Sequence, residues 1–78
     1  MTLAEFHQKT LSSIAAVVGF KGDELLIERL NEMGIYQGSH LEVIGQAPFS
    51  GPQLFRLSNT VLALRQEEAA CILVEDAK

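Results

Sequence analysis

Three side chains in this sequence are of the types that bind transition metals. They are His7, His40 and Cys71. A site for Fe²⁺ or Zn²⁺ needs imidazole, carboxylate or thiolate ligands gathered in space. These three residues are far apart along the chain, and neither histidine has a second histidine or a carboxylate placed as a ligand pair. We therefore expect both histidines to be structural or solvent-exposed, and we expect the monomer to hold no metal and no cofactor.

The same residue types argue against catalysis. Cys71 lies in an apolar segment without a neighbouring base to lower its pKa, so it is expected to pack as a small hydrophobic side chain. No Ser, Cys or Thr has a base and an orienting partner visible in the sequence, and no glycine-rich segment has phosphate-loop spacing. Glu67 and Glu68 are adjacent and would point apart on a helical turn. The sequence predicts a protein that is not an enzyme.

Apolar residues at turns offer a different kind of chemistry, which is binding to another protein. Phe49 lies in loop 47–52, between Pro48 and the turn formed by Ser50, Gly51 and Pro52. Its ring either folds under the loop onto the domain or stays exposed as an anchor, and both readings remain open. Met33, Ile35 and Tyr36, at the end of a helix predicted before this loop, could also be either packed or exposed for binding. The candidate partner-binding residues are Met33, Ile35, Tyr36, Pro48, Phe49 and Pro52.

A short amphipathic helix is predicted over 24–33. Apolar residues recur there at helical spacing, and Asp23 can cap the first turn. Gly34 ends the helix, because glycine adopts the left-handed conformation without a Cβ penalty, and Ile35 can fold back onto the last turn. Leu26, Leu30 and Met33 are expected to cover the open side of the domain.

The remaining pattern is β. Strands are predicted over 12–20, 40–46, 53–58, 60–64 and 71–75, with single helical turns at 2–6 and 65–69. Gly45 indicates a bulge or bend in the second strand. The first strand alternates at Ile14, Ala16, Val18 and Phe20, although Val17 interrupts the pattern. Inward-facing positions are expected at Leu41, Val43, Leu62, Leu64, Ile72 and Val74. The predicted class is mainly β, a small SH3-like antiparallel barrel of about five strands with one inserted α-helix.

Length and composition set further bounds. The chain has 78 residues, 47% of them hydrophobic and 21% charged, which is typical of one globular domain spanning 1–78. A net charge of −4 with six scattered Lys and Arg residues argues against nucleic-acid binding. No apolar run is long enough to span a bilayer, and the first residues do not form a secretion signal. We expect a cytoplasmic protein without direct membrane insertion.

The run 29–75, roughly two thirds of the chain, resembles the FeoA family of bacterial ferrous iron transport. The elements that carry the resemblance are the helix end, the loop with two prolines, and the close of the last helical turn and strand. They comprise Arg29, Leu30, Met33, Gly34, Ile35 and Gly38, then Ala47, Pro48, Phe49, Gly51 and Pro52, then Ala63, Leu64, Arg65, Ala69, Ile72 and Val74.

The resemblance implies an SH3-like protein that is not an enzyme and acts with the ferrous iron permease, a membrane protein bearing a cytoplasmic GTPase domain. An accessory or regulatory role by protein contact is the implied mechanism. The alternative is a generic SH3-like module that binds proline-rich peptides. One Tyr, four Phe and no Trp argue against that alternative, since such grooves are lined with several aromatics. Direct iron binding and assembly into a homo-oligomer stay open.

Overall fold

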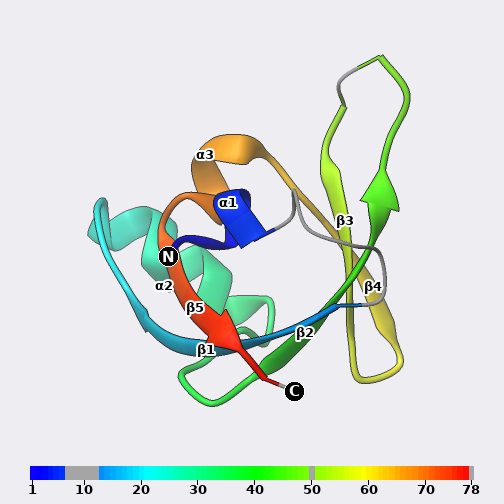
Figure 1. The fold of residues 1–78 in the computed structure, drawn as a ribbon. Helices are drawn as coiled ribbons and strands as arrows, with labels where there is room; N and C mark the ends of the chain where they lie inside the picture. Colours follow the sequence, from blue (N-terminus) through cyan, green and yellow to red (C-terminus); the bar gives the residue numbers. More distant parts are fainter. Residues whose placement is uncertain (7–12, 50, 78) are drawn as a thin grey trace.

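The computed structural model describes residues 1–6, 13–49 and 51–77 and has the predicted β architecture (Figure 1). Its strands form one antiparallel sheet in the order β4-β3-β2-β1-β5. The elements are α1 (Leu3–Phe6), β1 (Ile14–Phe20), α2 (Glu24–Glu32), β2 (His40–Gln46), β3 (Gln53–Leu57), β4 (Thr60–Leu64), α3 (Gln66–Ala69) and β5 (Ile72–Asp76). The two short helices α1 and α3 occupy the predicted helical turns. His7 lies outside the described residues.

The sheet curls around a single apolar core (Figure 1). The inward positions predicted for β2 and β5 are confirmed, since Leu41, Val43, Ile72 and Val74 are all buried. Leu64 is also fully buried, and Leu62 packs against the core from a partly buried position.

In β1 the buried residues are not those of the predicted alternating set, which was Ile14, Ala16, Val18 and Phe20. Ala15 and Val17 are buried, whereas Ile14 and Val18 are 44% and 43% exposed. The strand is apolar on both faces, so its period alone does not decide which face turns inward. Pairing decides it. Strand β1 lies between β2 and β5, and its register with β5 shifts between Val17 and Gly19.

The helix α2 begins at Glu24 as predicted and ends at Glu32, one residue before the predicted end. The Asp23 side chain accepts a hydrogen bond from the Leu25 backbone N–H at 2.8 Å, which satisfies one donor of the first turn. Leu30 is fully buried and Leu26 is partly buried. Met33 is the C-cap and remains 37% exposed, so it covers the core less than expected.

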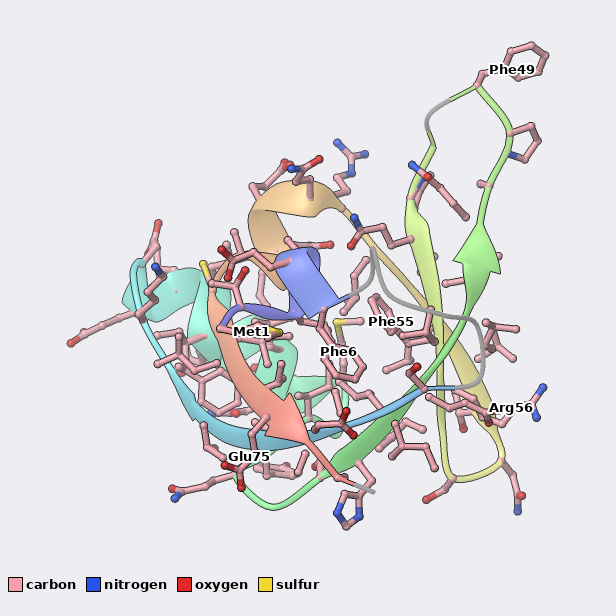
Figure 2. All side chains as sticks on the ribbon, viewed as in Figure 1. Met1, Phe6, Phe49, Phe55, Arg56 and Glu75 are labelled. Atoms are coloured by element: carbon pink, nitrogen blue, oxygen red, sulfur yellow. The ribbon has the colours of Figure 1, made fainter. Side chains whose placement is uncertain are left out.

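The N-terminal segment closes the domain beside β5. The Val74 N–H donates to the Met1 carbonyl at 2.8 Å, and Thr2 forms a bridge with Leu73. The helix α1 then places Leu3 and Phe6 in the core with no exposed surface. Figure 2 shows Phe6 pointing toward the interior, as Phe55 does.

A reciprocal pair of side-chain hydrogen bonds fixes the start of α1. The Glu5 carboxylate accepts from the Thr2 backbone N–H at 2.7 Å, and the Thr2 hydroxyl accepts from the Glu5 backbone N–H at 3.3 Å. This is a capping box. It orients the helical turn that carries two of the largest core side chains.

Leu30→Ala tests the packing of α2. Loss of a fully buried leucine should lower the free energy of unfolding by about 2–4 kcal/mol, through lost transfer energy and the cavity left behind. Leu25→Ala is the matched control, because Leu25 lies on the same helix and is 71% exposed. Denaturant unfolding should separate the two variants clearly. Equal stabilities would refute the assigned helix face.

The capping box predicts a measurable titration. The hydrogen bond from the Thr2 N–H lowers the pKa of Glu5 below its ordinary value of 4.5, because it favours the charged carboxylate. A lowered folded-state pKa stabilises the fold above the unfolded pKa, and this stabilisation is lost as the pH falls through the folded value. A carboxyl-detected NMR titration should show the lowered midpoint. A midpoint at or above the ordinary value would contradict the hydrogen bond.

Candidate partner-binding site

The chain leaves α2 through a complete glycine-terminated cap. The Gly34 N–H donates to the Asn31 carbonyl at 2.9 Å, and the Ile35 N–H donates to the Leu30 carbonyl at 3.1 Å. Gly34 has a φ of 99°, which a residue with a Cβ adopts only under strain. Ile35 is fully buried as a result. It positions this end of the helix and offers no surface to a partner, so its expected contact role does not fit the structure.

A tight turn presents Tyr36 beyond the buried isoleucine. The Ser39 N–H donates to the Tyr36 carbonyl, and the Tyr36 N–H donates to the Ser39 hydroxyl, both at 2.9 Å. The Gly38 N–H also donates to the Val17 carbonyl of β1 at 2.8 Å. The turn is therefore bonded both to itself and to the sheet. Residues 33–39, called the corner below, expose Tyr36 by 56%.

The second candidate surface is the far end of the β2–β3 hairpin, residues 46–49 and 51–53, called the arm below. The Ala47 N–H donates to the Pro52 carbonyl at 2.9 Å, and the Gly51 N–H is shared between the Ala47 and Pro48 carbonyls at 3.2 Å. A Cβ on Gly51 would lie 2.8 Å from the Ala47 Cβ, so only glycine fits this close turn. The loop is thus held by its own backbone.

Phe49 occupies the tip of the arm. Its side chain has a relative exposure of 101%, and Figure 2 shows the ring pointing away from the rest of the domain. Of the two open readings, the structure has the exposed ring and not the ring folded under the loop. The φ of Phe49 is 61°, a left-handed conformation that is uncommon for a bulky residue. Pro48 and Pro52 are also exposed on the arm.

The structure does not bring the corner and the arm together. The corner ends where β2 begins at His40, and the arm starts where β2 ends at Gln46. Seven extended residues between them span about 23 Å at the usual rise of a strand. Figure 1 shows the two at opposite ends of β2. They form two patches, one around Tyr36 and one around Phe49.

The candidate metal and nucleophile residues are also separate in the structure. His40 is exposed, and the Cys71 thiol donates a weak hydrogen bond to the Glu67 carbonyl at 3.4 Å from a partly buried position. Among the described residues, no three His, Cys, Asp or Glu side chains are grouped so that they could hold a metal ion. Within the same residues, no helix is long and apolar enough to cross a membrane.

A pocket that the sequence reasoning missed lies between the root of the arm and α3. Its volume is about 370 Å³. Gln53 of β3 is the notable residue, since its side chain is only 8% exposed and its Oε1 has no hydrogen-bond partner among the described residues. A signal was available, because Gln53 occupies the inward phase of β3 two residues before Phe55. The lining residues are Gln46, Gly51, Pro52, Gln53, Arg65, Gln66 and Glu67.

Among known proteins, this chain is similar to a fusion protein of two iron-transport components. The chain is 33% identical over 75 residues to an Fe(2+) transport protein A/Fe(2+) transporter FeoB fusion protein of Porphyromonas gingivalis. The match covers 96% of this chain and 8% of the relative. The chain therefore spans less than a tenth of that protein's length.

Two solved structures share the fold and more than a quarter of their aligned residues with this chain. Iron(II) transport protein A of Clostridium thermocellum is 27% identical with a TM-score of 0.84, covering 99% of this chain and 46% of its own. FeoA of Stenotrophomonas maltophilia, solved with zinc, is 28% identical with a TM-score of 0.75, covering 96% and 89%. The latter is described as a procaryotic SH3 domain protein and proposed as a ferrous iron transport activating factor. The expected SH3-like class is confirmed.

The family model described as the FeoA domain matches residues 1–76, which is nearly the whole sequence. The family match therefore extends the resemblance seen over 29–75 to the residues that precede it. The chain belongs to the FeoA domain family.

Proposed function

We propose that this protein is a small accessory factor of bacterial ferrous iron uptake, which acts by contact with the GTPase-bearing ferrous iron permease. Family membership supports an iron-transport role. The Porphyromonas gingivalis relative carries an Fe(2+) transport protein A and a FeoB transporter on one chain. Fusion holds two domains at high effective concentration. A separate chain needs a binding surface to reach the same arrangement.

The exposure of Phe49 is the observation that carries this proposal. Phe49 is the most exposed of the large apolar side chains, and a ring held fully in solvent adds nothing to the thin core of a small domain. Aromatic residues are common anchors of protein interfaces. The backbone hydrogen bonds of the arm and the close fit at Gly51 limit the conformational entropy that Phe49 would lose on binding.

The corner offers a second contact. Tyr36 is an amphipathic side chain on a turn that is bonded to β1, so it too is presented rigidly. Because the two patches lie at opposite ends of β2, a partner must either follow the length of β2 or use one patch only. We assign the larger share to the arm, since Phe49 is the more exposed ring.

The proposed mechanism is regulation by docking, without chemistry on this chain. Contact with the cytoplasmic GTPase domain of a permease requires a cytoplasmic location. The generic peptide-binding alternative is less well supported by the geometry. Phe6 and Phe55 are buried, and Tyr36 and Phe49 are far apart, so the described residues form no aromatic groove for a proline-rich ligand.

Phe49→Ala and Tyr36→Ala test the docking surface. Because both rings are exposed, each change should alter the free energy of unfolding by less than about 0.5 kcal/mol. Phe49→Ala should weaken capture of the permease at least about tenfold, as loss of an interface anchor does, and should lower ferrous iron uptake in cells. Tyr36→Ala should have the smaller effect.

Leu25→Ala is the control, since it removes an exposed apolar side chain outside both patches. It should leave capture and uptake as in the parent. If Phe49→Ala and Tyr36→Ala are folded and support capture and uptake as well as the parent, neither patch is the interface.

A metal titration tests whether the chain carries the ion itself. With His40 exposed and Cys71 apart from it, the monomer should bind Zn²⁺, used as a surrogate for Fe²⁺, only at the strength of adventitious surface sites. His40→Ala should remove no site tighter than this weak range. Stoichiometric submicromolar binding to the monomer that His40→Ala abolishes would show instead that this protein is a metal carrier or sensor.

A further inference from the structure

We propose that the outer edge of β4 (Thr60–Leu64) is a docking edge for a second copy of this chain, and that two copies pair their β4 strands antiparallel about Leu62. The edge includes neither Tyr36 nor Phe49, so this inference goes beyond the proposed function and does not depend on it. The contact is made chiefly by backbone groups.

The two edges of the sheet are built differently. The sheet runs from β4 to β5, so one side of each of these strands has no neighbour in the sheet. On β5 this side is covered by the N-terminal segment, through the bridge of Thr2 with Leu73, and the strand ends in two acidic residues. Covers and charges of this kind block pairing with another chain. The β5 edge is therefore closed.

Strand β4 carries none of these protections. Its sequence, TVLAL, contains no charge and no proline. Its register with β3 runs without a shift over the whole strand, so no bulge twists the edge away. Within the described part of the chain, no segment pairs with its outer side. A neutral, regular and uncovered edge of this kind is a template for strand pairing.

The backbone groups that face the outer edge belong to Val61 and Ala63. A two-residue turn at 58–59 connects β3 to β4, and Ser58 has a positive φ of 56° there. Such a turn is closed by a hydrogen-bonded pair, and bonded and non-bonded pairs alternate along the ladder from it. Leu62 is therefore bonded to β3, whereas the N–H and C=O groups of Val61 and Ala63 point away from β3. Among the described residues these groups have no other backbone partner.

This pattern is self-complementary. When two β4 strands run antiparallel with Leu62 opposite Leu62, Val61 of each copy lies opposite Ala63 of the other. Both residues present outward backbone groups, so each such pair exchanges both hydrogen bonds of a bonded pair. Leu62 is on the inward phase of β4 and yet only partly buried, since the sheet has no strand beyond it. In the paired sheet the two Leu62 side chains meet and lose exposed area.

Closure and charge favour a second copy over a strand of another protein. The pairing is isologous and the β5 edge of each copy is covered, so assembly stops at two chains and does not grow into a fibre. The chain carries a net charge of −4, but no like charges face each other along the neutral β4 strands. Two short strands bury far less than the roughly 1,200 Å² of the smaller specific interfaces. The pair is therefore weak, with a Kd on the order of 0.1–1 mM.

Backbone amide signals of the full chain test the pairing. When its concentration rises from about 0.02 to about 2 mM, the Val61 and Ala63 N–H signals should shift, and their hydrogen exchange should slow at least about twofold by mass action. The Leu62 N–H, bonded to β3, should exchange slowly at every concentration. In a mixture of ¹³C-labelled and unlabelled chains, isotope-filtered NOEs should join the Leu62 methyl groups of different copies.

Two substitutions at the edge should reduce the pairing. Ala63→Pro removes an outward N–H and no hydrogen bond to β3, so it should abolish the concentration dependence. Val61→Lys places a charge on the edge and should weaken pairing at least about tenfold. Val18→Lys is the matched control, because Val18 is also an exposed valine but lies in β1, between two paired strands. It should pair as the parent does.

Circular dichroism should show the parental fold for each variant, and Val61→Lys decides the question if Ala63→Pro does not fold. Signals that stay constant over the whole concentration range would overturn the proposal. Pairing that persists at parental strength in the folded edge variants would also overturn it, because the contact would then lie elsewhere. Shifts of Val61 and Ala63 only on addition of the permease's cytoplasmic GTPase domain would overturn the second copy as occupant and assign the edge to that partner.

Discussion

Closure of the domain by its first six residues is the interaction on which the rest of the structure depends. The β5 edge would otherwise be open, and the Val74–Met1 hydrogen bond at 2.8 Å covers it. Leu3 and Phe6 then complete a core in which both are fully buried. A domain of this length buries only about 60–65% of the surface that its unfolded chain exposes. Its stability therefore depends strongly on the large side chains that do reach the core, Phe6 and Leu3 among them.

In a domain with so small a core, an apolar side chain that stays exposed does not contribute to folding stability by burial. Phe49 lies outside the core, although the core contains few aromatic rings. The arm that carries it is fixed by backbone hydrogen bonds and by a glycine whose Cβ would clash, so its exposure is built into the chain. Gln53 shows the converse, as a polar residue that is 8% exposed at an inward position of β3. Both residues belong to the same hairpin.

The sequence predicted those features that depend on local chemistry. Asp23 and Gly34 mark the ends of α2 because capping and a positive φ are properties of single residues. The bulge at Gly45 is present as a register shift between Val43 and Gly45. These features require no knowledge of what lies across the sheet.

The features that the sequence did not predict depend on contacts between distant segments. The inward face of β1 is set by its register with β2 and β5, since the strand is apolar on both sides. Ile35 is buried because the cap turns it back over the helix. The distance between Tyr36 and Phe49 follows from the length of β2. The pocket at Gln53 exists only because α3 packs near the arm, and a lone inward glutamine was its single sequence signal.

The four phenylalanines allow one direct measurement of docking through the arm. With ring-specific ¹³C labelling, Phe49 reports the arm, Phe6 and Phe55 report the core, and the partly buried Phe20 reports β1. On addition of the permease's cytoplasmic GTPase domain, the Phe49 signals should shift or broaden while those of Phe6 and Phe55 stay unchanged. A complex that forms, as judged by slower tumbling, with the Phe49 signals unaltered would contradict the account.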